Sequence, residues 1–287
     1  MGRLIDSIIL TKHILNNETL SRLNIAIIAA CFIHEGDMMS LLKKALLGFA
    51  ALAVTASVYA STTTISFFGG NNYVIGNKNA WTLEFLHFSE WKYGDNLFFF
   101  DVTNPHRDVT TISGEWSSRF SFSKITGKSI SVGPISDVLF ATELAVTGEN
   151  MRQYGLGLGT DWKMPEHATF STNAYWIHND TYRGQTYQLA ALWSLPFAVN
   201  DRFTFIFGGL VNYFGAMTGS VISSETGKPV HLKANLLFEP SLMLDLGHAL
   251  NISSNKLYVG LQYAYWHNML GTSLNQSVPE LKLTWVL

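Results

Sequence analysis

Hydrophobic and polar residues alternate with a period of two along most of the chain after residue 61. In the segment 115–122, for example, Trp116 and Phe120 fall on one face, and Glu115 and Arg119 fall on the other. This alternation is typical of half-buried β-strands, and Gly, Asn, Asp, Pro and Ser separate the segments as turn residues do. The pattern predicts twelve strands, near residues 63–75, 81–91, 97–102, 115–122, 137–146, 153–162, 168–179, 184–196, 202–214, 228–246, 255–267 and 277–287.

The connections between these segments alternate between short and long. An even number of antiparallel strands with short turns at one end is the plan of an outer-membrane barrel. Such a sheet must close on itself, because lipid offers no partner for free backbone groups. We therefore predict an all-β fold: a single antiparallel transmembrane β-barrel of about 12 strands, preceded by a cleavable signal peptide. The expected short connections are 92–95, 126–128, 163–167 and 197–201, and the expected longer ones are 104–111, 178–184, 215–229 and 268–277.

Aromatic residues stand near the ends of many segments, as a girdle at the membrane interfaces would require. A soluble β-sandwich is the main alternative, since it also alternates. Only 14% of the residues are charged and 13% are aromatic, which favours the barrel. The net charge of −2 does not indicate a nucleic-acid partner. The aromatic residues expected on the lipid-facing side are Trp81, Trp91, Tyr154, Trp162, Trp176, Trp193, Tyr213 and Tyr265.

Residues 39–60 have the three parts of a secretory signal peptide. Lys43 and Lys44 precede an apolar stretch at 45–56, and Val58-Tyr59-Ala60 is a cleavage site of the small-x-small type. The apolar stretch is shorter than the roughly 20 residues of a transmembrane helix, which is the alternative reading.

Residues 1–38 would then be a spurious N-terminal extension, with translation starting at Met38 or Met39. A lipoprotein processing box at Ile28–Cys31 is the alternative for this region. Residues 61–287 would form the barrel, and the export signal places it in the outer membrane of a Gram-negative cell, in contact with lipid and lipopolysaccharide.

The alternation also predicts which side chains line the interior. Nine acids and four bases are expected there, so the interior either holds a narrow channel or is filled by ion pairs and amides that satisfy one another. The charged residues expected inside are Glu84, Glu90, Glu115, Arg119, Asp137, Glu143, Asp161, Arg202, Lys233, Glu239, Asp245, Glu280 and Lys282; the expected aromatic residues are Phe88, Tyr175, Tyr258 and Trp266.

Four short stretches, in order and at similar spacing, carry a resemblance to a known family. They are Trp81-Thr-Leu-Glu-Phe85, Arg119-Phe-Ser-Phe-Ser-Lys-Ile-Thr126, Ser131-Val-Gly-Pro134 and Tyr154-Gly-Leu-Gly-Leu-Gly-Thr-Asp161. Over about residues 81–165 the chain resembles the Tsx family of nucleoside-specific outer-membrane channels. The resemblance implies a monomeric barrel with a narrow passage that binds nucleosides through aromatic and ionisable side chains. The polar positions that match are Glu84, Glu115, Arg119 and Asp161.

The sequence thus predicts a passive channel for nucleosides or similar small polar ring solutes. A structural, adhesive or phage-docking barrel is the alternative. No Gly-x-Ser-x-Gly elbow or His-Glu-x-x-His motif is present, so we expect no enzyme, metal or cofactor. The predicted solute-binding residues are Glu84, Phe88, Glu115, Arg119, Glu143, Asp161, Tyr175, Tyr258 and Trp266.

Overall fold

The computed structural model describes residues 58–105, 110–147, 151–165 and 167–287. The predicted extension 1–38 and nearly all of the predicted signal peptide lie outside these residues, so both stay predictions. The first strand begins at Val58, three residues before the predicted mature start. Among the described residues, no helix is long and apolar enough to cross a membrane.

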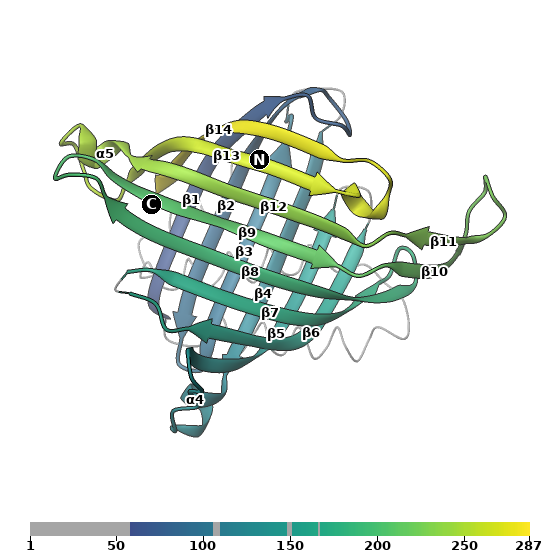
Figure 1. Cartoon of the computed structure of the whole chain (residues 1–287), viewed down its shortest axis with the longest axis horizontal. Helices are drawn as coiled ribbons and strands as arrows, with labels where there is room; N and C mark the ends of the chain where they lie inside the picture. Colours follow the sequence, from purple (N-terminus) through teal and green to yellow (C-terminus); the bar gives the residue numbers. More distant parts are fainter. Residues whose placement is uncertain (1–57, 106–109, 148–150, 166) are drawn as a thin grey trace, which may run out of the picture. The chain divides into compact units, whose positions relative to one another are not determined.

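Twelve antiparallel strands form a closed barrel, which confirms the predicted fold (Figure 1). The final strand closes it, because Trp285 pairs with Ile65 on one side and with Leu257 on the other. The barrel strands are β1 (Val58–Asn71), β2 (Asn79–Trp91), β3 (Gly94–Thr103), β4 (Thr111–Ser121), β5 (Ile135–Thr147), β6 (Arg152–Trp162), β7 (Thr169–Asn179), β8 (Gly184–Ala198), β9 (Thr204–Phe214), β12 (Asn235–Asp245), β13 (Leu257–His267) and β14 (Gln276–Val286).

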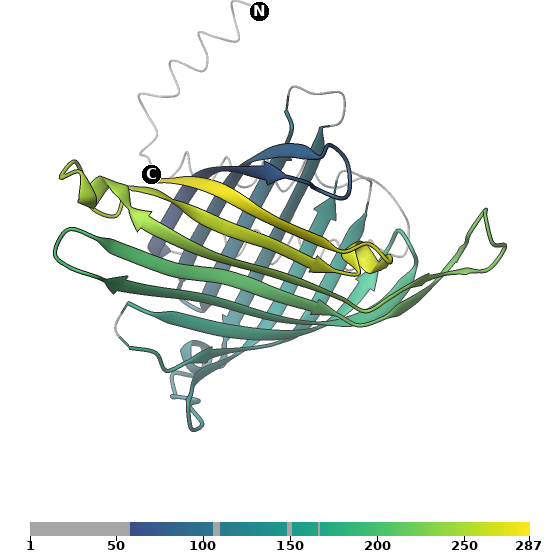
Figure 2. The same cartoon turned by 45° about the horizontal axis from the view of Figure 1, so that its top comes forward.

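The connections gather at two opposite ends of the barrel, and each end has its own short elements. We call the end that holds the β2–β3 turn the turn end, and the opposite end, which holds the β1–β2 loop, the loop end. In Figures 1 and 2, α5 lies at the turn end and the β10–β11 hairpin lies at the loop end. The short elements are α4 (Phe122–Thr126) and α5 (Leu246–Ala249) at the turn end, and β10 (Met217–Ile222), β11 (Pro229–Leu232) and the 3₁₀-helix η2 (Met269–Gly271) at the loop end.

The expected short turn at 126–128 is wrong, because β4 leads into a small helix. The side chain of Ser121 accepts a hydrogen bond from the backbone N–H of Lys124 and caps the start of α4. Gly127 ends the helix in the left-handed region at φ 68°, where glycine carries no steric cost. Ser121 and Gly127 are residue types that commonly cap helices. The alternation of β4 continues to Phe122, however, so the sequence pattern predicts a strand at the position where α4 begins.

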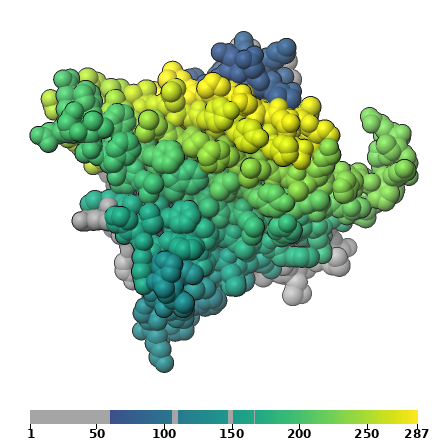
Figure 3. Space-filling view, viewed as in Figure 1, coloured from purple at the N-terminus to yellow at the C-terminus, as the bar shows by residue number. Residues whose placement is uncertain are grey.

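The single predicted strand 228–246 is also wrong, because the chain leaves and re-enters the barrel in this region. β11 pairs with β10 in a separate two-stranded sheet, and only β12 belongs to the barrel. Between them the backbone N–H of Lys233 bonds to the carbonyl of Gly271 in another loop. This hairpin stands clear of the barrel wall, at the right of the space-filling view (Figure 3).

The outer face of the barrel is apolar, as a surface in lipid must be. The pairing registers place all eight predicted girdle aromatics there, together with Trp285, which is 60% exposed. Among the described outward positions of the twelve strands, Arg152 at the loop end is the only Asp, Glu, Lys or Arg. With this one exception, the Asp, Glu, Lys and Arg residues at the described strand positions face the interior.

Candidate functional site

All nine predicted solute-binding residues lie on the inward face of the barrel. Glu143, for instance, belongs to a row of paired residues that runs from Phe88 through Ser117 to Gly155. Side chains in such a row share one face of the sheet. The structure thus gives their direction, while their contact with a solute stays a prediction.

The interior is more acidic than the sequence suggests. Arg202 and Lys233, expected inside, lie in connections outside the barrel strands, where Arg202 donates to the carbonyl of Ala249 and Lys233 donates to Ser273. Among the described inward strand positions, only Arg119 and Lys282 are basic. The acids at those positions are Glu84, Glu90, Asp95, Asp101, Glu115, Asp137, Glu143, Asp161, Glu239, Asp245 and Glu280.

Asp95 and Asp101 were missed for two different reasons. The expected turn 92–95 includes Asp95, but the real turn holds only residues 92 and 93, so Asp95 is already in β3. Asp101 follows the apolar run 97–100, in which both faces of the strand are apolar and the alternation carries no information on direction. Its pairing with Glu84 places it inside.

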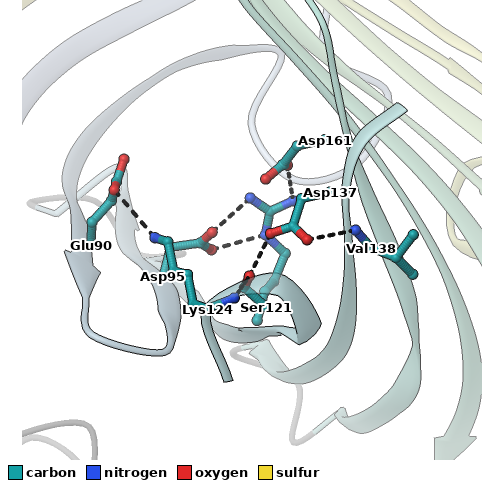
Figure 4. Close-up of polar contacts among 8 residues, drawn as sticks. Glu90, Asp95, Ser121, Lys124, Asp137, Val138 and Asp161 are labelled. Carbon is teal, nitrogen blue, oxygen red and sulfur yellow. Dashed lines mark hydrogen bonds and ion pairs between the residues drawn. The ribbon is translucent and has the colours of Figure 1, made fainter. Parts of the chain in front are cut away.

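The guanidinium of Arg119 joins three strands near the turn end, since it bonds to Asp95 and Asp161; both carboxylates are labelled in Figure 4. Its Nε and Nη2 atoms donate to the two carboxylate oxygens of Asp95 at 2.9 and 2.8 Å. Its Nη1 atom donates to Asp161 Oδ1 at 2.8 Å. The bidentate pair with Asp95 is the stronger geometry for a carboxylate. Arg119 and Asp95 are nearly buried, with side chains 13% and 11% exposed.

Small residues let Arg119 reach across a whole strand to Asp161. Directly beside it are Ala141 on β5 and, beyond that, Gly157 on β6. Neither residue has a side chain long enough to block the guanidinium. The glycine alternation of β6, which gave a sequence resemblance, therefore has a structural reason at this point.

Next to Arg119, a group of hydroxyls and carboxylates lies at the turn end. Ser121 and Ser123 donate to the two carboxylate oxygens of Asp137 at 2.5 and 2.6 Å. Lys124 of α4 forms a longer ion pair with Glu90 at 3.4 Å, and both side chains are well exposed. Asp137 is thus held by its neighbours (Figure 4), whereas the side chain of Glu90 is 47% exposed.

A second polar group lies in the wall formed by β4 to β8. Glu143 accepts a hydrogen bond from Gln153 at 2.9 Å, and Glu115 accepts one from Ser117 at 2.6 Å. Glu143 and Tyr175 are each only 4% exposed. These two residues are enclosed by neighbours, so in this conformation they shape the wall and present little surface to a solute.

The opposite wall, formed by β1, β2, β13 and β14, centres on Lys282. Its Nζ atom donates to Gln262 at 3.0 Å and pairs with Glu84 at 3.4 Å. The same ammonium lies 4.7 Å above the ring of Phe68, a cation–π contact. Gln262 in turn donates to Glu280 at 3.1 Å. Lys282 is therefore the one basic residue at the described inward positions of this wall, which is rich in carboxylates.

The inward aromatic rings differ in how much surface they keep. Tyr258 is 8% exposed and donates to Asn255 near the turn end, whereas Phe88 and Trp266 are only partly buried. Trp266 donates to Asn235 at 3.3 Å, which fixes the indole at the loop end. Three inward rings were missed because apolar residues flank them on both sides in the sequence: Phe68, Phe99 and Phe214.

The family description "Nucleoside-specific channel-forming protein, Tsx" matches residues 69–282. The chain belongs to this family. As a member of the Tsx family it is an outer-membrane channel, which confirms the predicted location and the resemblance. No curated protein sequence matches the chain.

Solved porin structures are similar to this Tsx-family barrel at low sequence identity. The structure titled "KdgM porin in complex with disordered oligogalacturonate" aligns with a TM-score of 0.43 and 7% identity, over 77% of this chain and 98% of that one. The structure titled "NanC porin structure in rhombohedral crystal form" aligns with a TM-score of 0.44 and 11% identity, over 78% and 98%.

Proposed function

We propose that this channel lets nucleosides, or similar small polar ring compounds, diffuse passively across the outer membrane. The observation that carries the proposal is the match to the nucleoside-specific Tsx family, which spans all of β2 to β13. We also propose that one chain is the working unit, because the strands close within a single chain. Light scattering of the purified barrel measures its molar mass, which should equal that of one chain.

The lumen has the chemical groups that a nucleoside requires. Phe88 and Trp266 are flat, partly exposed rings on which a base can stack. The carboxylates of Glu84 and Asp161, 16% and 35% exposed, can accept hydrogen bonds from ribose hydroxyls. A channel needs such contacts to be weak and repeated, so that the solute also leaves.

The charge of the lumen supports a neutral solute. Acids outnumber bases on the inward strand faces, and both bases, Arg119 and Lys282, already contact carboxylates. A nucleotide would bring a phosphate against these carboxylates, and like charges disfavour such a partner strongly. A nucleoside carries no such charge.

Planar-bilayer conductance with added nucleosides tests the proposal. The purified barrel should give small conductance steps, and adenosine or thymidine should reduce them in a saturable manner. Trp266→Ala should weaken this block, since it removes an inward ring. Trp176→Ala is the matched control, because Trp176 lies on the lipid-facing side and is 60% exposed.

The possible results test nucleoside specificity, channel activity and the role of Trp266 separately. Steps that nucleosides leave unchanged would remove the nucleoside claim and retain a channel for other small solutes. An absence of steps from a folded barrel would return the protein to the structural or docking role. Equal block of the Trp266→Ala and Trp176→Ala variants would assign Trp266 to packing.

A further inference from the structure

The loop between β1 and β2 bonds to inward residues of the last strand. We call this loop, residues 72–78, the strap. The hydroxyl of Tyr73 donates to Glu280 Oε1 at 2.6 Å, and the backbone N–H of Val74 donates to Gln276 Oε1 at 3.3 Å. Both acceptors are inward residues of β14 and are only 3% and 5% exposed. Two hydrogen bonds therefore tie the strap to the inner wall.

The local sequence explains why the chain turns inward at this point. β1 ends at Asn71, earlier than the predicted strand 63–75, and Asn72 adopts the left-handed conformation at φ 73°. Asparagine tolerates this region better than most residues. The strap then closes on itself, because the N–H of Tyr73 bonds to the carbonyl of Lys78 at 3.0 Å.

The strand also leaves room for the ring of Tyr73. Gly70 lies directly opposite Glu280 and contributes no side chain to the inward face. A Cβ atom at this glycine would stand 2.5 Å from the carbonyl oxygen of Pro279, so only glycine fits there without a shift. The inner face beside Glu280 is thus free for a group that comes from the strap.

Tyr73 is the first member of a chain of hydrogen bonds that runs along the inner face of the wall. Glu280 accepts from both Tyr73 and Gln262, and Gln262 accepts from Lys282, which pairs with Glu84 on β2. Burial, followed by the hydrogen bond to Glu280, raises the pKa of Tyr73 above its usual value. The phenol keeps its proton at neutral pH, as an ordinary tyrosine does, and is the donor that holds the strap in place.

We propose that the strap is a fixed constriction at the loop end of the pore, and that Tyr73 limits the size of the solute that passes. The inference rests on the passage of solutes proposed above. Tyr73 reaches the depth of Glu280, which lies four residues inside the loop-end limit of β14. Pore width and the groups that line it decide which solutes pass a channel.

Single-channel conductance of Tyr73→Ala tests the proposal. Removal of the ring should raise the conductance at least about 1.5-fold, since the narrowest cross-section widens. It should also let larger sugars enter proteoliposomes in a swelling assay. Tyr93→Ala is the matched control, because Tyr93 stands in the β2–β3 turn at the other end, and its ring packs on the outward Trp91. A Tyr73→Ala conductance equal to that of the native channel would overturn the proposal.

A second variant keeps the test valid if Tyr73→Ala does not fold. Cys31 is the only cysteine of the chain, so Tyr73→Cys in a Cys31→Ser background carries one thiol. A bulky methanethiosulfonate reagent should lower the conductance of this variant and leave Tyr93→Cys unchanged. An unaltered current after complete labelling of Tyr73→Cys would show that position 73 lies outside the pore. The conductance of the native channel and its block by nucleosides are measured in parallel. A result that contradicts the constriction by the strap can then be told apart from one that contradicts the proposed nucleoside channel.

Discussion

Replacement of Arg119 by glutamine should destabilise the barrel more than replacement of its partner Asp161 by asparagine. Arg119→Gln leaves Asp95 and Asp161 side by side without their shared cation. The side chain of Asp95 is only 11% exposed, so water can stabilise its charge poorly. The side chain of Asp161 is 35% exposed, so water stabilises its charge better when the cation is removed.

The magnitude follows from burial. Removal of one partner from a buried ion pair costs about 3–5 kcal/mol, because a buried charge is left alone. Water in the lumen reduces this cost, so we expect a loss of about 3 kcal/mol in the free energy of unfolding. Asp161→Asn keeps the bidentate pair with Asp95 and should cost only about 1 kcal/mol. Lys124→Gln, in the exposed pair with Glu90, should cost less than about 0.5 kcal/mol.

Urea-induced unfolding in lipid vesicles, followed by tryptophan fluorescence, measures these differences. The triple variant Arg119→Gln, Asp95→Asn, Asp161→Asn removes all three charges and should regain about 2 kcal/mol of the loss. The reasoning is refuted if Arg119→Gln is no less stable than Asp161→Asn. It is also refuted if the triple variant is as unstable as Arg119→Gln alone.

Two further predictions concern the lumen and its glycine strand. In a KCl gradient the zero-current potential should show a preference for cations, and Glu84→Gln should reduce it; a preference for anions would contradict the acidic lumen. Gly157→Ala should cost about 1–3 kcal/mol of unfolding free energy, since its Cβ would stand 1.8 Å from the backbone oxygen of Ala174. Gly159→Ala should cost less, because its nearest neighbour at 2.5 Å is the movable side-chain oxygen of Asn173; equal losses would count against this difference.

The fold was predictable because every strand in lipid repeats the same rule. Polar residues at alternate positions mark the inward face, and for Glu280 the apolar neighbours Pro279 and Leu281 on the other face leave no ambiguity. The rule fails where apolar residues fill both faces. This is the case at Asp101, whose direction is fixed only by its pairing with Glu84.

Features that depend on distant partners were beyond the reach of the pattern. Asn71 and Asn72 are common turn residues, but nothing local indicates that the strand ends at Asn71 and not at residue 75 as predicted, or that Tyr73 bonds to Glu280, 207 residues away in sequence. The break between β11 and β12 likewise depends on a contact of Lys233 with Gly271. The candidate site thus follows from the sequence as a set of inward residues, but its constriction does not.

Deletion of residues 285–287 should prevent assembly of the barrel in the outer membrane. The backbone N–H of Val286 bonds to the carbonyl of Lys256, and that of Leu287 bonds to the carbonyl of Thr63. These bonds join the last residues to both neighbouring strands. Without them backbone groups of β1 and β13 would lie unpaired at the seam, where each unsatisfied group costs several kcal/mol.

The assay for this deletion is the heat-modifiable shift of the folded barrel on gels of isolated outer membranes. The matched control removes the three residues 224–226, which form the turn of the β10–β11 hairpin outside the barrel. That deletion leaves every barrel pair in place, so the control should insert and shift normally. Normal insertion of the barrel shortened at its C-terminus would mean that pairing of β14 up to Thr284 is enough without its last three residues. The closure would then depend on the remaining registers, from Thr284 with Ser66 to Glu280 with Gly70.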